Sequence, residues 1–191
     1  MWPQVSALEK QVDQLMARAS AAGNDHAGRA AALEEYLQLA RVHQDDEQFE
    51  VGAWSEELAD SYLALGRVDD AVRTIRNATE WGYGEGAEML CELAEKLMRT
   101  GYEPQARPLW EQARADYPED VWVYVQAGIE YSELGDHATA LSWLTPGLEL
   151  ALRTGGGPES VIEQLHPLRV SCLVALGQEP DELQARAAEQ L

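Results

Sequence analysis

The residues most able to bind a metal are Glu163 and His166, in the stretch Glu163-Gln-Leu-His166. A carboxylate and an imidazole three residues apart lie on one face of a helix. Two such pairs with two further glutamates build the di-metal sites of four-helix bundles. The sequence contains no second Glu-x-x-His, and His26, His43 and His137 stand beside predicted helix ends. We therefore expect no metal and no cofactor.

Other catalytic patterns are missing from the sequence. Gly155-Gly156-Gly157 lacks the Lys-Ser/Thr that follows a phosphate-binding loop, and a predicted helix rather than a strand precedes it. Cys91 and Cys172 form no Cys-x-x-Cys motif and fit a reducing cytoplasm. No Ser/His/Asp or Cys/His set can be assembled. The prediction is a protein that is not an enzyme.

The charge limits the class of partner. Net charge is −20 at pH 7, and the arginines are scattered along the chain. Binding to nucleic acid or to an anionic membrane needs clustered Lys and Arg, so we expect neither partner. No run of 18 apolar residues is present, and the start MWPQVSALEKQ lacks a signal-peptide pattern. We expect a cytoplasmic location, and twelve arginines against two lysines are typical of a GC-rich bacterial genome.

An internal repeat organises the middle of the chain. The glycines of Leu65-Gly66, Thr100-Gly101 and Leu134-Gly135 are 35 and then 34 residues apart. Small residues recur seven positions before, five after and twelve after each glycine. They are Ala59, Ala94 and Gly128; Ala71, Ala106 and Ala140; and Ala78, Ala113 and Gly147. A period of this length predicts stacked supersecondary units.

The recurring residues are those that two closely packed antiparallel helices need. Glycine ends the first helix, and small residues let the two axes approach. In the middle unit Leu90 and Leu97 lie on one apolar stripe, and Leu109 lies on the stripe that meets it. Pro118 stops a helix, and Asp120 can cap the next one. The segment 121–125, VWVYV, resembles a strand, but the repeat frame predicts a helix there.

On these motifs the chain resembles the tetratricopeptide repeat (TPR) proteins. Their unit of about 34 residues carries small residues at these offsets and an aromatic residue where Tyr62 and Tyr131 stand. The resemblance implies an all-α, right-handed superhelical solenoid of about ten helices, spanning residues 1–191 as one array. Three well-formed repeats are expected over 52–153. Degenerate hairpins are expected over 1–44 and, after a Gly-rich insertion at 154–158, over 158–191.

In that family, five positions of each unit's first helix face a concave groove. The resemblance places an acidic wall and an apolar patch there. The predicted groove residues are Glu56, Asp60, Glu88 and Glu95, with Met98, Trp122, Val125 and Ile129. One branch of the family binds a C-terminal carboxylate through Lys, Asn and Arg. This chain has Glu56, Asp60, Trp122 and Gln126 at those positions, and the reversed charge excludes that ligand.

The expected function is a non-catalytic scaffold for protein–protein interaction. Its partner would be a peptide or helix with apolar anchors and basic flanks, held chiefly by Trp122. The alternative reading is that Trp122 and Val125 pack on a neighbouring hairpin and that the acids are solvated.

Two other roles stay open. Leu183 and Ala187 form an apolar stripe near the C-terminus, where a repeat array usually presents a polar face. That stripe suggests self-association, as a homodimer joined by the C-terminal hairpin. The chain is alternatively the regulatory part of a longer protein.

Overall fold

The computed structural model describes residues 7–43, 49–82, 87–155 and 161–191, and all regular structure in this part of the chain is helical. It divides into two compact units, Met1–Met89 and Leu90–Leu191. Most of the Gly-rich insertion lies outside the described residues. The all-α prediction is confirmed, and the single-array prediction for 1–191 stays a prediction.

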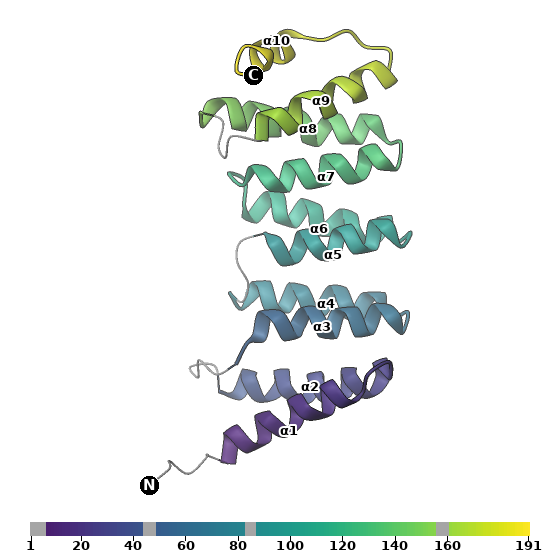
Figure 1. Cartoon of the computed structure of the whole chain (residues 1–191), viewed down its shortest axis with the longest axis vertical. Helices are drawn as coiled ribbons and strands as arrows, with labels where there is room; N and C mark the ends of the chain where they lie inside the picture. The colour runs from purple at the N-terminus through teal and green to yellow at the C-terminus, as the bar shows by residue number, and fades with distance from the viewer. Residues whose placement is uncertain (1–6, 44–48, 83–86, 156–160) are drawn as a thin grey trace. The chain divides into compact units, whose positions relative to one another are not determined.

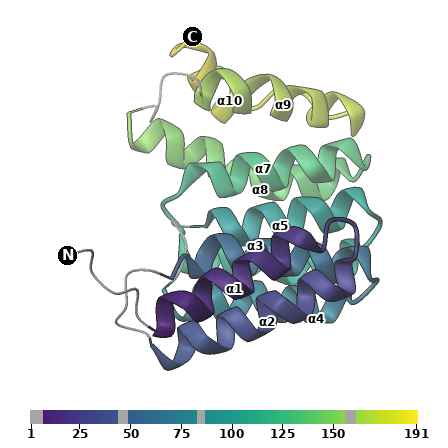
Figure 2. The same cartoon turned by 60° about the horizontal axis from the view of Figure 1, so that its bottom comes forward.

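In the described part of unit 1, the helices α1 to α4 pack in chain order (Figures 1 and 2). Asp25 begins the second helix by accepting a hydrogen bond from Gly28 N at 3.0 Å. On this helix Leu33, Tyr36 and Ala40 are buried, and Leu37 is partly exposed. The helices are α1 (Ala7–Ala21), α2 (His26–Val42), α3 (Val51–Ala64) and α4 (Val68–Glu80).

Unit 2 holds almost all of the fifth helix and five more. They are α5 (Glu88–Arg99), α6 (Glu103–Asp116), α7 (Val121–Glu133), α8 (His137–Arg153), α9 (Val161–Ala175) and α10 (Glu182–Ala188). Helix α7 packs on α6, α8 and α9, and α10 packs on α8 and α9. The stretch 121–125 is helical, as the repeat predicts, and Asp120 caps it through Trp122 N at 3.0 Å.

The small-residue columns mark close helix contacts. The seven alanines of the three columns are all buried. A Cβ built on Gly128 of α7 would lie 2.3 Å from Leu144 Cδ2 of α8, and one on Gly147 would lie 2.7 Å from Tyr124 Cβ. These distances leave no room for a side chain, so the small residues set how closely α7 and α8 approach.

The repeated glycines end the first helix of each hairpin. Gly66 and Gly135 have φ of 71° and 78°, a left-handed conformation that favours glycine. In both turns the amide following the glycine returns to a carbonyl of the preceding helix, as with Asp136 N and Tyr131 O at 2.9 Å. The predicted helix ends are therefore confirmed at these positions.

Candidate functional site

The α7 face of unit 2 carries the apolar part of the predicted groove. Trp122 is 36% exposed in the first turn of α7, and Ile129, two turns later on the same face, is partly exposed. Val125 is 1% exposed and Met98 is 2% exposed, so the prediction that these two side chains line an open groove is wrong. Both side chains are instead part of the buried core. The apolar surface is therefore Trp122 with Ile129.

A charge network joins α5 to α7 in unit 2. Glu95 Oε1 pairs with Arg99 at 2.6 Å, and Arg99 also donates to Glu130 Oε1 at 3.0 Å. Glu130 is buried; desolvation raises the pKa of its carboxyl, and the Arg99 charge partly opposes that rise. Glu95, a member of the predicted acidic wall, is therefore paired with the cation Arg99, and this pairing weakens the negative field at Glu95.

The other predicted acids belong to unit 1. Glu56 and Asp60 lie one turn apart on α3, with Glu56 half-buried and Asp60 exposed. Glu88 is exposed at the first residue of α5. Asp60 and Glu88 are therefore open to solvent, each on the first helix of its own hairpin.

A cleft of about 360 Å³ lies in unit 1 among α2, α3 and α4, and it was not among the predicted sites. Its apolar part is formed by Leu37, Leu58 and Tyr62. Three arginines line it: Arg41 at the end of α2, Arg67 just before α4, and Arg73 within α4. In a protein of net charge −20, three guanidinium groups at one cleft make a locally basic site.

Two arginine–aromatic contacts form part of this cleft. The guanidinium carbon of Arg67 lies 4.2 Å from the centre of the Tyr62 ring, and that of Arg41 lies 5.0 Å from the Trp81 ring. Both distances are within the range of cation–π attraction. A guanidinium group that lies over an aromatic ring can still donate hydrogen bonds through its N–H groups.

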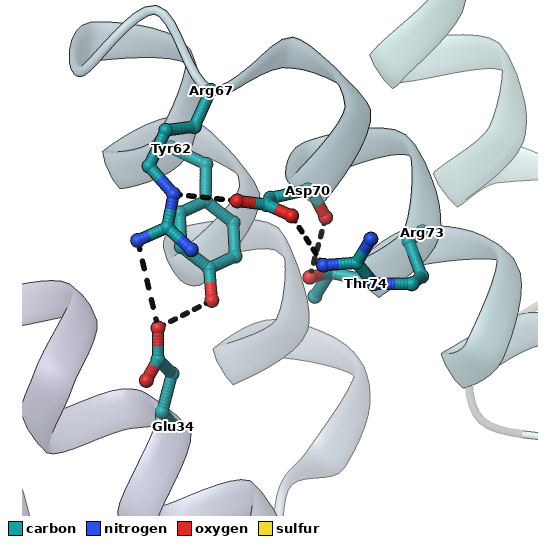
Figure 3. Close-up of polar contacts among 6 residues, drawn as sticks. All are labelled: Glu34, Tyr62, Arg67, Asp70, Arg73 and Thr74. Atoms are coloured by element: carbon teal, nitrogen blue, oxygen red, sulfur yellow. Dashed lines mark hydrogen bonds and ion pairs between the residues drawn. The ribbon is translucent and has the colours of Figure 1, made fainter.

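A short polar chain orients Arg67 and Tyr62 (Figure 3). The Tyr62 hydroxyl donates to Glu34 Oε1 at 2.5 Å, and Arg67 Nη1 lies 3.8 Å from the same oxygen. Arg67 Nε donates to Asp70 Oδ2 at 2.5 Å, and Arg73 donates to the other oxygen of Asp70. Burial, followed by the bond to Glu34, raises the pKa of Tyr62 to about 12, so its phenol stays protonated.

Part of this cluster is visible in the sequence. Arg67, Asp70 and Arg73 are spaced by three residues, which places them on one helix face. Glu34 comes from the preceding hairpin, and only the packing of α2 on α3 brings it to Tyr62. Sequence spacing alone could not have found that contact.

A second hollow of about 380 Å³ lies among α1, α2 and α3. Met16, Leu33 and Trp54 make it apolar, and Arg29 and Glu57 stand at its edge 3.5 Å apart. It carries little charge of its own and suits an apolar side chain.

Glu163 and His166, the pair most able to bind a metal in the sequence, both lie on α9. In the described ranges, no three His, Cys, Asp or Glu side chains gather as metal ligands would. His166 lies inside α9, where its backbone oxygen accepts from Gln184 Nε2 at 3.0 Å. None of the helices described is long and apolar enough to cross a bilayer.

Comparison with known proteins relates the fold to helical repeats. No family model matches the sequence, and no curated protein matches it. A crystal structure of the MamA protein matches with a TM-score of 0.50 at 14% sequence identity, covering 95% of this chain and 88% of that one. MamA AMB-1 matches with a TM-score of 0.50 at 17% identity, covering 95% and 90%. BtubC from P. vanneervenii matches with a TM-score of 0.50 at 16% identity, covering 98% and 89%.

At these identities the likeness concerns the fold alone. The neighbours are TPR-like helical solenoids, so the all-α, helical-repeat class is shown for this chain. The structural matches therefore support the helical-repeat fold that the repeated glycines and small residues predicted.

Proposed function

We propose that this protein is a non-catalytic interaction module that binds a peptide or helix with apolar anchors and basic flanks. One observation carries the proposal: Trp122 exposes 36% of its surface on the first helix of a hairpin. Large aromatic side chains of this kind commonly dominate the binding energy of an interface. Val125, three residues further along the same helix, is buried in the core.

Charge favours a basic partner. The net charge of −20 attracts cationic segments, and Glu95 belongs to the same unit as Trp122. Glu56, Asp60 and Glu88, the other acids of the predicted groove, belong to unit 1 and add to that net charge. Such carboxylates speed the encounter and set the orientation of a partner more than its final affinity. Because Glu95 pairs with Arg99, the apolar anchor supplies most of the affinity.

Selection from a displayed random-peptide library tests the proposal. We expect selected peptides to carry an aromatic or aliphatic residue flanked by Lys or Arg. Trp122→Ala should weaken them at least about tenfold, the loss typical of a central interface anchor. Tyr102→Ala is the matched control, since Tyr102 is an aromatic side chain of similar exposure in the same unit. Equal losses in both variants, or peptides without basic flanks, would contradict the proposal.

Self-association is a second candidate, and its surface differs from the predicted one. Ala187 is fully buried and Leu183 partly buried, because α10 packs on α8 and α9. Val174 and Leu176 near the α9–α10 turn are instead exposed, Val174 by 66%. If this edge joins two copies, sedimentation will show a concentration-dependent dimer that Val174→Asp disrupts. A monomer at all concentrations removes this candidate.

A further inference from the structure

We propose that the cleft among α2, α3 and α4 is a second binding site, one that receives side-chain carboxylates of an acidic peptide beside an apolar residue. Nothing in the first proposal requires this site. The two sites differ in the sign of their charge, and the apolar anchor of the first, Trp122, lies on α7 rather than on a helix of the cleft, so each can be tested without the other.

The polar lining of the cleft is rich in donors. The guanidinium groups of Arg41, Arg67 and Arg73 and the amides of Gln38 and Asn77 line it. Among the described residues that line this cavity, Glu34 is the one carboxylate. A ligand that matches this lining must be rich in acceptors and negatively charged.

The arginines retain donor capacity after their internal contacts are made. The side chain of Arg67 is 45% exposed and that of Arg73 is 65% exposed. Each guanidinium has five N–H groups in a planar fork, and Asp70 occupies only some of them. The free edges can therefore engage a carboxylate without first breaking the pairs with Asp70.

The apolar part of the cleft adds a requirement for the ligand. Leu58 and Tyr62 are buried at the cleft, and the Trp81 ring is exposed beside Arg41. A volume of about 360 Å³ accommodates one large side chain with its neighbours rather than a folded domain. A short peptide in which carboxylates flank an apolar residue satisfies both the donors and this apolar surface.

The charge balance favours a carboxylate over a phosphate. Glu34 lies in the lining, and Asp70 stands directly behind Arg67 and Arg73. The three guanidinium groups and these two acids sum to about one positive charge, which one carboxylate balances. A phosphate ester carries close to two negative charges and would leave the cleft net negative. A ligand carboxylate, with a single negative charge placed on the edge of one guanidinium group, fits the net charge of the cleft better.

The test is a fluorescence anisotropy titration of the full chain with a labelled peptide of glutamates around one phenylalanine. We expect saturable binding that weakens as salt is added. The double variant Arg41→Ala/Arg73→Ala should weaken it at least tenfold. Arg18→Ala/Arg153→Ala removes the same net charge from two exposed arginines outside the cleft, and should change the affinity less than twofold.

A variant expected to bind more tightly guards against simple loss of folding. Glu34→Gln removes the carboxylate of the lining while its amide oxygen can still accept from Tyr62, so the acidic peptide should bind several-fold more tightly. The proposal is overturned by any of three results: absence of saturable binding, equal losses in the two double variants, or weaker binding by Glu34→Gln. A phosphoserine peptide that binds tenfold more tightly than the glutamate peptide would overturn the assignment to carboxylates.

A further arm separates the two proposals. Trp122→Ala should leave binding of the acidic peptide unchanged, and Arg41→Ala/Arg73→Ala should leave binding of the basic, apolar peptides unchanged. If Trp122→Ala abolishes binding of the acidic peptide, a separate site in the cleft is wrong.

Discussion

Gly128 of α7 lies directly against Leu144 of α8, so that a Cβ added to the glycine would come within 2.3 Å of Leu144 Cδ2. Leu144 is fully buried and cannot turn outward. One pair of residues therefore fixes the spacing of the two helices that form the hairpin at the centre of unit 2. A glycine in mid-helix costs about 1 kcal/mol of helix propensity, so its presence here reflects packing rather than local preference.

Gly128→Ala should destabilise unit 2 by about 1–2 kcal/mol in denaturant unfolding. The gain in helix propensity of about 1 kcal/mol is outweighed by overpacking, which typically costs 1–3 kcal/mol or more at a contact this short. The control is the same change in a Leu144→Ala background, where the clash is absent. There Gly128→Ala should become neutral or stabilising, and additive effects of the two changes would contradict the packing argument.

Arg169→Met should lower the free energy of unfolding by about 1–3 kcal/mol, since it leaves the buried Gln184 side chain without this donor and removes the ion pair with Asp181. Arg169 is a buried arginine of α9 that donates to Thr145 at 3.1 Å, Asp181 at 2.9 Å and Gln184 at 3.1 Å. These bonds tie α10 and its cap to α8 and α9. Arg153→Met is the matched control, since it removes an exposed pair with Glu119; equal losses would show that the Arg169 network adds nothing.

The same network should make stability depend on acid pH. The hydrogen bond from Arg169 lowers the pKa of Asp181 below its ordinary value near 4. The unfolded chain then binds the proton first as pH falls, so this stabilisation is full above pH 4 to 5 and is lost below it. Asp181→Asn should flatten the pH dependence in that range. An unchanged acid profile in Asp181→Asn would exclude this carboxylate as its source.

Tyr62 should ionise later than an ordinary tyrosine. Its pKa is raised to about 12, first by burial and then by the bond to Glu34. Because the unfolded phenol loses its proton near pH 10, the stabilisation is complete below that pH and is lost as pH rises toward 12. Tyrosinate absorbance, compared between the natural chain and Tyr62→Phe, isolates this step. Glu34→Gln should lower the pKa of Tyr62 only partly, since burial remains; a return to 10 would make Glu34 the main cause.

Both cysteines should resist alkylation in the folded protein at pH 8. Cys91 and Cys172 are buried, and burial raises the pKa of the Cys91 thiol to about 12. The neutral thiol is a poor nucleophile, and access to it requires opening of the structure. Mass spectrometry after iodoacetamide treatment should find both thiols unmodified until denaturant is added. Rapid modification of Cys91 without denaturant would show that α5 opens readily.

Much of the architecture could be predicted because periodic backbone requirements leave a local mark. A glycine such as Gly135, needed for a left-handed turn, and an alanine such as Ala140, needed for close packing, recur at fixed offsets. Asp120 and Pro118 mark a helix start and a helix end within a few residues of themselves. Such signals depend on sequence neighbours alone, so one sequence is enough to read them.

The candidate sites were predicted less well, because side-chain exposure depends on what packs above. Family positions assigned Met98 and Val125 to an open groove, and the structure buries both. The contact of Glu34 with Tyr62 joins residues from different hairpins, and so does that of Arg99 with Glu130. The sequence shows each residue but contains no local signal that pairs them.

The tryptophans give unit 2 an internal optical probe. Trp110 and Trp143 are both fully buried, and Trp110 Nε1 has no hydrogen-bond partner among the described residues. An indole in such dry surroundings emits at short wavelength, whereas the exposed indoles of Trp81 and Trp122 emit further to the red. Loosening of the unit 2 core would therefore shift the emission of two rings at once. Ligand binding at Trp122 or Trp81 would change the red part of the spectrum alone, so unfolding and recognition can be followed separately in unlabelled protein.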